Sequence, residues 1–227
     1  MNVNELKKYT TDLNYSYSFG AFVTIELLKY RPKDVFCVLV DESFQSQEAF
    51  QTIKKICIEY KIQLVVNTKI VSKLRNKDNC FVIGVFKKYQ SNINKNKHVI
   101  LENVNDFGTI GTIIRSMHGF NFDNLILINC DIDIYHPHII RSSMGAYFNI
   151  NIEKFDNIEK YLSRYGNRNI FQCYENGQHQ IKDISKKEAN LSLWLNPKID
   201  TKYQSINTNS LCSLENNANI LFFHFYE

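Results

Sequence analysis

The sequence predicts an α/β protein of two domains, and three observations predict this class. The chain has 227 residues, a length that suits two domains of about 100 residues each. Hydrophobic residues make up 44% of the chain and charged residues 22%, as in ordinary globular proteins, which excludes the disordered and fibrous classes. Short β-branched apolar runs alternate with segments of helical period, and one polar segment without periodicity interrupts the alternation.

The first domain is predicted over residues 1–90. Apolar positions have helical spacing from residue 19 to residue 30, Pro32 follows, and a β-branched strand is expected at 35–40. The same pattern then repeats as a helix at 47–60, a strand at 63–66, a helix at 69–75 and a strand at 80–86. An alternation of this kind indicates a small α/β domain.

A linker is predicted at residues 91–97, which are polar and lack periodicity. The second domain, residues 98–227, again alternates strands with helices. Its expected strands are 98–103, 124–129, 148–152, 168–174 and 191–195 with an extended piece at 203–207, and its expected helices are 109–119, 136–146, 157–165 and 213–226. Strands and helices of these lengths favour a mostly parallel sheet that is covered on both faces.

Positive charge is concentrated in the N-terminal part of the chain. The net charge of +4 divides into +7 over residues 1–97 and −3 over residues 98–227. A basic half suits a partner with a phosphate backbone, because Lys and Arg side chains near phosphates release condensed counterions. The alternative is that the lysines cover a solvated surface, which the abundance of Lys, Asn and Ile also fits.

The cysteines and histidines do not indicate a metal or redox site. Six cysteines lie far apart, mostly inside apolar runs, and no C-x-x-C pair occurs, so we expect small buried residues in a reducing cytoplasm. His136 and His138 flank Pro137 without a third ligand at a useful spacing, so we expect no metal. The apolar runs fall short of the roughly 20 residues that a membrane span needs, so we expect no membrane partner.

A glycine-containing turn between a predicted strand and a predicted helix supplies the first candidate site. The segment from Glu102 to Ser116 reads ENVNDFGTIGTIIRS, and its glycines allow a close backbone approach at the start of the helix. Arg115 falls on the first helical turns, where it can project into the crevice at the carboxyl ends of the strands. The alternative for Arg115 is an ion pair on the helix surface.

A second candidate segment follows the next predicted strand. Residues 136–146 read HPHIIRSSMGA, and the small residues at its end allow close backbone contact. Arg141 can bind a phosphate or cap a helix C-terminus. An ordinary close-packed helix end explains the small residues equally well.

Together these segments resemble the motifs of the SpoU/TrmH RNA 2′-O-ribose methyltransferases, a family of the SPOUT superfamily. Gly111 and Arg115 reproduce the Gly-x-x-x-Arg spacing of the first motif, and residues 141–146 resemble the R-A-S-x-G-A helix end. The N-terminal half is similar to one branch of the family, where YSYSFG from Tyr15 opens a small ribosomal-protein-like domain and CFVIGVF from Cys80 closes it.

The resemblance implies a small α/β substrate-binding domain followed by a SPOUT-like α/β domain with a parallel sheet and a trefoil knot. It also implies transfer of a methyl group from S-adenosylmethionine to a ribose 2′-hydroxyl of rRNA or tRNA. The enzyme would be a cytoplasmic homodimer whose second subunit helps to complete the RNA site. Arg115 would be the catalytic residue and would stabilise the developing alkoxide, while Asn103, Arg141 and Ser143 would contact the RNA.

The cofactor motifs near the C-terminus are matched only in part. The family has a G-N-E-x-x-G loop and an I-P-M…S-L-N segment, whereas this chain has Asn196 after a strand, SLEN from Ser213, and no glycine in its last 50 residues. The resemblance assigns cofactor contacts to Asn196, Ser213, Leu214 and Asn216, with capping of the final helix as the alternative for Ser213 and Asn216. The alternative function is an inactive RNA-binding member that has lost cofactor binding.

Two other groups of residues are interpreted structurally. Tyr15, Tyr17 and Phe19 alternate along the chain, which favours core packing, with stacking on RNA bases as the alternative. Asp131 and Asp133 are expected to form a loop and cap the following helix rather than to act as a carboxylate pair.

Overall fold

The computed structural model of the chain describes residues 2–166, 168–188, 190–209 and 211–226. The chain divides into two compact units. The N-terminal unit contains Met1–Gln90 with Asp133–Phe148, and the C-terminal unit contains Ser91–Ile132 with Asn149–Glu227. The division at residue 90 coincides with the start of the predicted linker, but residues 133–148 were expected in the second domain.

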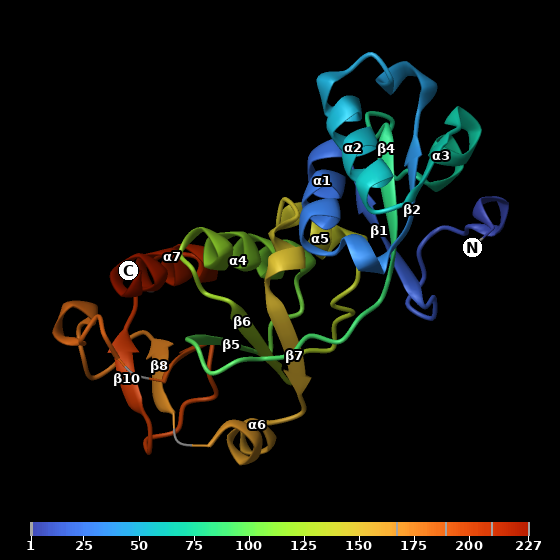
Figure 1. The fold of residues 1–227 in the computed structure, drawn as a ribbon. Helices are drawn as coiled ribbons and strands as arrows, with labels where there is room; N and C mark the ends of the chain where they lie inside the picture. The colour runs from blue at the N-terminus through green and yellow to red at the C-terminus, as the bar shows by residue number, and fades with distance from the viewer. Residues whose placement is uncertain (1, 167, 189, 210, 227) are drawn as a thin grey trace. The chain divides into compact units, whose positions relative to one another are not determined.

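The N-terminal unit is built on a mixed sheet of four strands (Figure 1). Their order is β1 (Tyr15–Phe19), β4 (Val82–Lys87), β2 (Val35–Val40) and β3 (Gln63–Val66). β4 is antiparallel to both of its neighbours, and β2 and β3 are parallel. The helices of this unit before residue 90 are α1 (Ala21–Tyr30), α2 (Glu48–Glu59) and α3 (Thr68–Leu74).

Strand β1 was not predicted, because the sequence analysis assigned no element before residue 19. All five of its residues are buried, which confirms that Tyr15, Tyr17 and Phe19 pack in a core. The serines between them are buried as well, and their hydroxyls have partners: Ser18 with the Thr24 hydroxyl at 2.9 Å, and Ser16 with a backbone oxygen. The strand is therefore covered on both faces, although its sequence alternates polar and aromatic residues.

Residues 133–148 belong to the N-terminal unit because they pack on its first strand and its last. Ser16 Oγ in β1 donates to the Tyr135 carbonyl at 2.6 Å. Arg31 Nε donates to the Phe148 carbonyl at 3.1 Å, and its guanidinium lies 4.4 Å from the centre of the Tyr89 ring. The two hydrogen bonds join segments more than 100 residues apart in the sequence, which local periodicity cannot reveal.

Helix α5 (Pro137–Ser142) is shorter than predicted. Met144 and Gly145 have positive φ angles of 52° and 83°, and such left-handed backbone ends an α-helix. Residues 146–149 form a short 3-10 helix, so the strand expected at 148–152 begins only at residue 151. The other 3-10 helices are Val3–Glu5, Pro32–Asp34, Glu42–Phe44 and Ile181–Asp183.

The C-terminal unit contains a sheet of six strands, all parallel, which confirms the predicted sheet type. Their order is β10 (Gln204–Asn207), β8 (Asn169–Tyr174), β9 (Leu191–Leu195), β5 (His98–Glu102), β6 (Asn124–Ile128) and β7 (Asn151–Phe155). Helices α4 (Phe107–Gly119) and α7 (Leu214–Phe225) cover one face, and α6 (Ile158–Tyr165) covers the other (Figure 1). The predicted trefoil knot stays a prediction.

The carboxyl ends of these strands form one edge of the sheet, and the strand order reverses between β5 and β9. Ligands of parallel α/β sheets bind at such a reversal. Asn103, Asn129 and Asn196 follow β5, β6 and β9, and their φ angles are 56°, 50° and 53°. Asparagine is one of the few residues besides glycine that adopt this left-handed conformation readily. Asparagines thus take the place of glycine at the left-handed turns that follow these three strands.

Three further observations concern the described part of the chain. No helix in it combines the length and the apolar character required to cross a bilayer. Its His, Cys, Asp and Glu side chains include no group of three or more that is arranged to hold a metal ion. Five of the six cysteines are buried as predicted, and Cys212 is half-buried.

Candidate functional site

The loop after β9 is held in place from two neighbouring strands. Asn196 Nδ2 donates to the backbone carbonyl of Glu102 at 3.0 Å, and the Glu102 carboxylate accepts from Lys198 N at 2.5 Å. The buried side chain of Gln172 in β8 donates to the Lys198 carbonyl at 3.3 Å and accepts from Asp200 N at 3.1 Å. These bonds fix the loop at the carboxyl edge of the sheet.

A cavity of about 280 Å³ lies at the carboxyl ends of β8, β9 and β10, beside the first turn of α7. We call it the β8–β10 cavity. Its lining residues are Cys173, Tyr174, Glu175, Leu195, Asn196, Pro197, Ile199, Thr208, Leu214 and Asn217. The structure therefore brings Asn196 and Leu214, two of the four predicted cofactor residues, to one cavity although 18 positions separate them.

The other two predicted cofactor residues, Ser213 and Asn216, do not line this cavity. Ser213 is the N-cap of α7, and its hydroxyl accepts from Asn216 N at 3.3 Å. Both side chains are exposed. The two residues thus take part in the N-terminal cap of α7, which was the alternative interpretation of the sequence.

The sequence analysis missed Asn217, which lines the cavity instead of its neighbour. Its Nδ2 donates to the Asn209 carbonyl at 3.0 Å, and its Oδ1 accepts from Asn209 N at 3.2 Å. This reciprocal pair fixes the connection between β10 and α7. The signal that could have identified Asn217 in the sequence is its pairing with Asn209 in a segment that contains no glycine.

A second cavity, of about 630 Å³, lies at the carboxyl ends of β5, β6, β7 and β9. We call it the acidic cavity. Its lining residues are Glu102, Asn129, Asp156, Asn157, Ile158, Glu159, Trp194, Lys198, Ile199, Asp200 and Thr201. Four carboxylates face a single lysine in this set, so the cavity repels phosphate groups. Ile199 lines both cavities, which places them next to each other.

Arg115 lies on an exposed part of α4 and is not among the side chains that line these cavities. The prediction that it projects into the crevice at the strand ends therefore does not hold within a single chain. The helix begins at Phe107, two residues earlier than predicted. Arg115 thus lies about 12 Å along the helix axis from its first residue, away from the edge of the sheet where the cavities open.

The start of α4 is fixed by hydrogen bonds to its first turn. Asp106 is the N-cap, and its carboxylate accepts from Thr109 N at 2.6 Å. A hydrogen bond from the Thr109 side chain holds the pKa of Glu215 in α7 below its ordinary value. Thr109 thus joins the first turns of α4 and α7. Asn103, which precedes this helix, is exposed, and its side-chain oxygen accepts from Asn129 Nδ2.

Residues 96–195 match the model of the SpoU rRNA Methylase family. The matched segment runs from β5 to the end of β9 and includes both the Gly-x-x-x-Arg helix and the R-S-S-x-G-A segment. Residues 96–195 thus form a domain of the SpoU rRNA Methylase type.

Relatives of this SpoU domain are similar over part or most of the chain. The mitochondrial rRNA methyltransferase 3A of Danio rerio is 30% identical over 98 residues, which are 41% of this chain and 22% of that protein. The rRNA methyltransferase of Sinorhizobium meliloti superposes with a TM-score of 0.73 at 19% identity, over 93% of this chain and 86% of that one. The SpoU methyltransferase AviRb of Streptomyces viridochromogenes, solved with the cofactor AdoMet, has a TM-score of 0.72 at 15% identity, over 93% and 89%.

The structural neighbours match most of the chain, whereas the curated relatives match a smaller part of it. The fold of 93% of the chain is similar to the folds of these two structural neighbours. The chain spans less than a quarter of the length of the curated relatives it matches.

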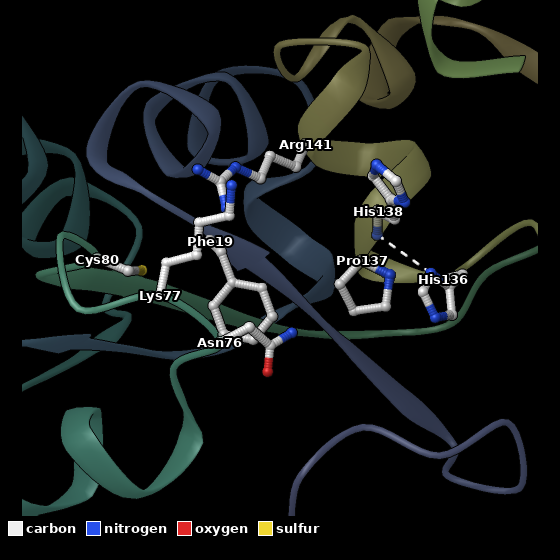
Figure 2. Close-up of a pocket in the computed structure, with 8 residues that line it drawn as sticks. All are labelled: Phe19, Asn76, Lys77, Cys80, His136, Pro137, His138 and Arg141. Carbon is white, nitrogen blue, oxygen red and sulfur yellow. Dashed lines mark hydrogen bonds between the residues drawn. The ribbon is translucent and has the colours of Figure 1, made fainter. Parts of the chain in front are cut away.

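Part of the SpoU motif lies in the N-terminal unit, where Arg141 lines a cavity of about 350 Å³ (Figure 2). We call it the α5 cavity. Its lining residues are Phe19, Asn76, Lys77, Cys80, His136, Pro137, His138 and Arg141. His136 caps α5 by accepting from His138 N at 3.2 Å, and burial lowers the pKa of its imidazole. Of the predicted RNA contacts, Arg141 is thus positioned at a concave surface.

Ser143 is not positioned to contact RNA. Its side chain is 1% exposed. The hydroxyl donates to the Ile140 carbonyl at 2.9 Å and accepts from Tyr147 N at 3.3 Å. This burial does not fit the predicted RNA contact and shows instead that Ser143 stabilises the end of α5.

Asp133 has a structural role in the loop before α5, as predicted, but it does not cap that helix, whose N-cap is His136. Its carboxylate accepts from Tyr135 N at 3.0 Å, forms a hydrogen bond with the Tyr9 hydroxyl, and lies 3.9 Å from Lys88 Nζ. Asp131, two residues earlier, is exposed.

Proposed function

We propose that the chain is an RNA methyltransferase that transfers a methyl group from S-adenosylmethionine to a ribose 2′-hydroxyl of rRNA or tRNA. The observation that carries this proposal is the β8–β10 cavity of the SpoU domain, which holds Asn196 and Leu214 at the carboxyl edge of the sheet. The curated relatives are named as rRNA methyltransferases, and one structural neighbour contains AdoMet.

The residues of this cavity fit the cofactor. Its volume of about 280 Å³ is close to the roughly 300 Å³ at which small-molecule sites begin. Leu195, Ile199 and Leu214 offer apolar surface for an adenine ring. The exposed carboxylate of Glu175 complements a cationic group, and the N–H groups that start α7 can bind a carboxylate. When bound, S-adenosylmethionine supplies a methyl group activated by a positively charged sulfur.

Arg115 is proposed to bind the acceptor ribose and an adjoining phosphate. Its guanidinium stabilises negative charge as the 2′-hydroxyl loses its proton. Because Arg115 is exposed and lines neither cavity of its own C-terminal unit, we propose that it acts in a homodimer, where the second subunit completes the RNA site.

An apolar patch on α7 supports the homodimer. Ile220, Phe223 and Tyr226 are 50%, 71% and 46% exposed. They lie on or next to the helix that packs against α4, and the Phe120 ring contacts Phe223 and Tyr226 edge-on. Exposed aromatic groups of this kind are typical of interfaces, and a second copy of the chain would cover them.

The proposed cofactor site is tested by calorimetric titration of the full chain with S-adenosylhomocysteine. We expect micromolar binding, lost in Leu214→Arg, which fills the cavity with a long charged side chain. Asn216→Ala is the matched control, because Asn216 is two residues away and lies outside the cavity. Circular dichroism verifies that both variants are folded.

No heat from the natural sequence at high ligand concentration would contradict the proposal, as would equal affinity in Leu214→Arg. Transfer of labelled methyl groups to rRNA and tRNA then identifies the acceptor. Digestion to nucleosides shows whether the label is on the ribose 2′ oxygen or on a base.

A further inference from the structure

The α5 cavity contains two cations from different parts of the chain. Lys77 comes from the loop after α3, and Arg141 comes from α5. Figure 2 shows that both side chains extend into the same cavity, above the ring of Phe19. No Asp or Glu is among the residues that line it.

These two charges are not neutralised within the described part of the chain. The ion pairs formed there include neither Lys77 nor Arg141. The nearest acids along the sequence have other cations: Asp78 lies 3.4 Å from Arg75, and Asp133 lies 3.9 Å from Lys88. Two converging cations with no carboxylate between them are suited to an anion.

The backbone on both sides of the cavity is held by hydrogen bonds. Arg75 Nη1 donates to the Asp78 carbonyl at 2.8 Å, and Cys80 N donates to the Lys77 carbonyl at 3.1 Å. The segment leading into α5 is bound to β1 through Ser16. Since the supports of both cations are already ordered, binding an anion costs little further ordering of the chain.

We propose that the α5 cavity binds a phosphate group of the RNA, with Lys77 and Arg141 as its two cationic contacts. The identity of the ligand as RNA rests on the proposed function. Arg141 supplies a planar fork of donors, Lys77 a point charge, and the Asn76 amide a neutral donor. Buried Phe19, Cys80 and Pro137 provide apolar walls that exclude water and so strengthen the attraction.

A polyanion fits this cavity better than a small free anion does. The N-terminal unit, residues 1–90 with 133–148, carries a net charge of +5, so the cavity lies in a unit that attracts an extended phosphate backbone. Contacts to phosphate carry no sequence information. The cavity therefore positions the RNA strand and does not select its sequence.

The test measures binding of a fluorescein-labelled single-stranded RNA of mixed sequence to the full chain by anisotropy, between 50 and 200 mM salt. Each lost phosphate contact lowers the slope of log affinity against log salt by about 0.7. For Lys77→Ala and Arg141→Ala, the loss of affinity relative to the natural sequence should therefore be about 2.6-fold larger at 50 mM than at 200 mM.

Two controls make the result specific. Lys69→Ala removes an exposed lysine of α3 outside the cavity and should change neither affinity nor slope. Arg141→Lys keeps the charge and should keep the slope of the natural sequence. Affinity for S-adenosylhomocysteine should be the same in all four variants, because Lys77 and Arg141 lie outside the β8–β10 cavity.

The outcomes separate this inference from the proposed function. If the natural sequence binds RNA and both alanine variants behave like Lys69→Ala, the cavity is not a phosphate site, while the methyltransferase proposal stands. If the natural sequence binds no RNA at any salt concentration, both proposals are wrong. Saturable binding of inorganic phosphate alone, lost in Lys77→Ala and without competition from RNA, would assign the cavity to a free anion and overturn the inference.

Discussion

The side-chain amide of Asn196 donates a hydrogen bond to the backbone carbonyl of Glu102, with 3.0 Å between the two atoms. The bond joins the carboxyl ends of β9 and β5, the two strands between which the strand order reverses. Asn196 has a φ angle of 53°, so the same residue forms the turn and fastens it to the neighbouring strand. A glycine could adopt this φ angle but could not make the bond.

Substitutions at Asn196 separate these two contributions. Ala lacks the hydrogen bond and also pays about 1–2 kcal/mol for left-handed backbone, whereas Gly loses only the hydrogen bond, worth about 1 kcal/mol. We expect urea unfolding to rank the natural sequence above Asn196→Gly and Asn196→Gly above Asn196→Ala. Both variants should bind S-adenosylhomocysteine more weakly, because Asn196 lines the β8–β10 cavity.

Asn121 provides the control for this prediction. Its φ angle is 57°, and it follows α4 outside both cavities. Asn121→Ala should destabilise the fold through the same backbone strain and leave the affinity for S-adenosylhomocysteine unchanged. Equal stability of Asn196→Ala and Asn196→Gly would show that the left-handed turn is not the source of strain.

The sequence predicted those parts of the fold that depend on local pattern. The mainly apolar runs at residues 98–102, 124–128 and 191–195 identified the central strands of the parallel sheet, because strands buried on both faces are predominantly apolar. The motif of Arg141 identified a helix end that the structure places at a cavity. In each case the prediction depended only on residues that are close together in the sequence.

Features that depend on contacts between distant segments could not be predicted. The bond between Gln172 and Asp200 spans 28 residues, and Lys77 and Arg141 meet at one cavity across 64. The sequence analysis weighed Arg141 alone and gave Lys77 no role. It also placed Arg115 in a crevice, since a motif fixes the position of a residue along a helix but not which cavities its side chain lines.

Arg115→Ala should lower the rate of methyl transfer with little effect on cofactor binding. Loss of one group that stabilises developing negative charge typically lowers kcat by about 10²–10³-fold, and we expect a loss of this size. Affinity for S-adenosylhomocysteine should not change, because Arg115 does not line the β8–β10 cavity. Thr112→Ala alters an exposed position three residues away on the same helix and should keep the natural rate. An active Arg115→Ala variant would remove Arg115 from the mechanism.

Phe223→Asp should convert the proposed homodimer to a monomer. Phe223 is 71% exposed on α7, and a carboxylate there cannot be buried against a second copy without a large desolvation penalty. Sedimentation velocity should show a dimer for the natural sequence and a monomer for the variant. The control is Phe22→Asp, which changes a 55% exposed aromatic residue of α1 in the N-terminal unit. A natural chain that sediments as a monomer at micromolar concentration would contradict the dimer.

His98 should make the stability of the protein depend on pH below neutrality. The side chain is fully buried. Its Nε2 lies 2.8 Å from the Asn94 carbonyl and its Nδ1 lies 2.9 Å from the Tyr161 hydroxyl, an arrangement that suits a neutral ring donating at one nitrogen and accepting at the other. Burial lowers the pKa of His98 to about 4, against about 6.5 in an unfolded chain.

The sign of the effect follows from proton uptake. Between pH 6.5 and pH 4 the unfolded chain binds a proton at His98 that the folded chain does not, so the free energy of unfolding falls as the pH falls through this window. In His98→Gln this contribution is absent, and urea unfolding should show its stability approaching that of the natural sequence as the pH drops from 6.5 to 4. His138→Gln, at an exposed position, should retain the pH dependence. A constant difference between the natural sequence and His98→Gln across this range would mean that His98 is protonated equally in both states.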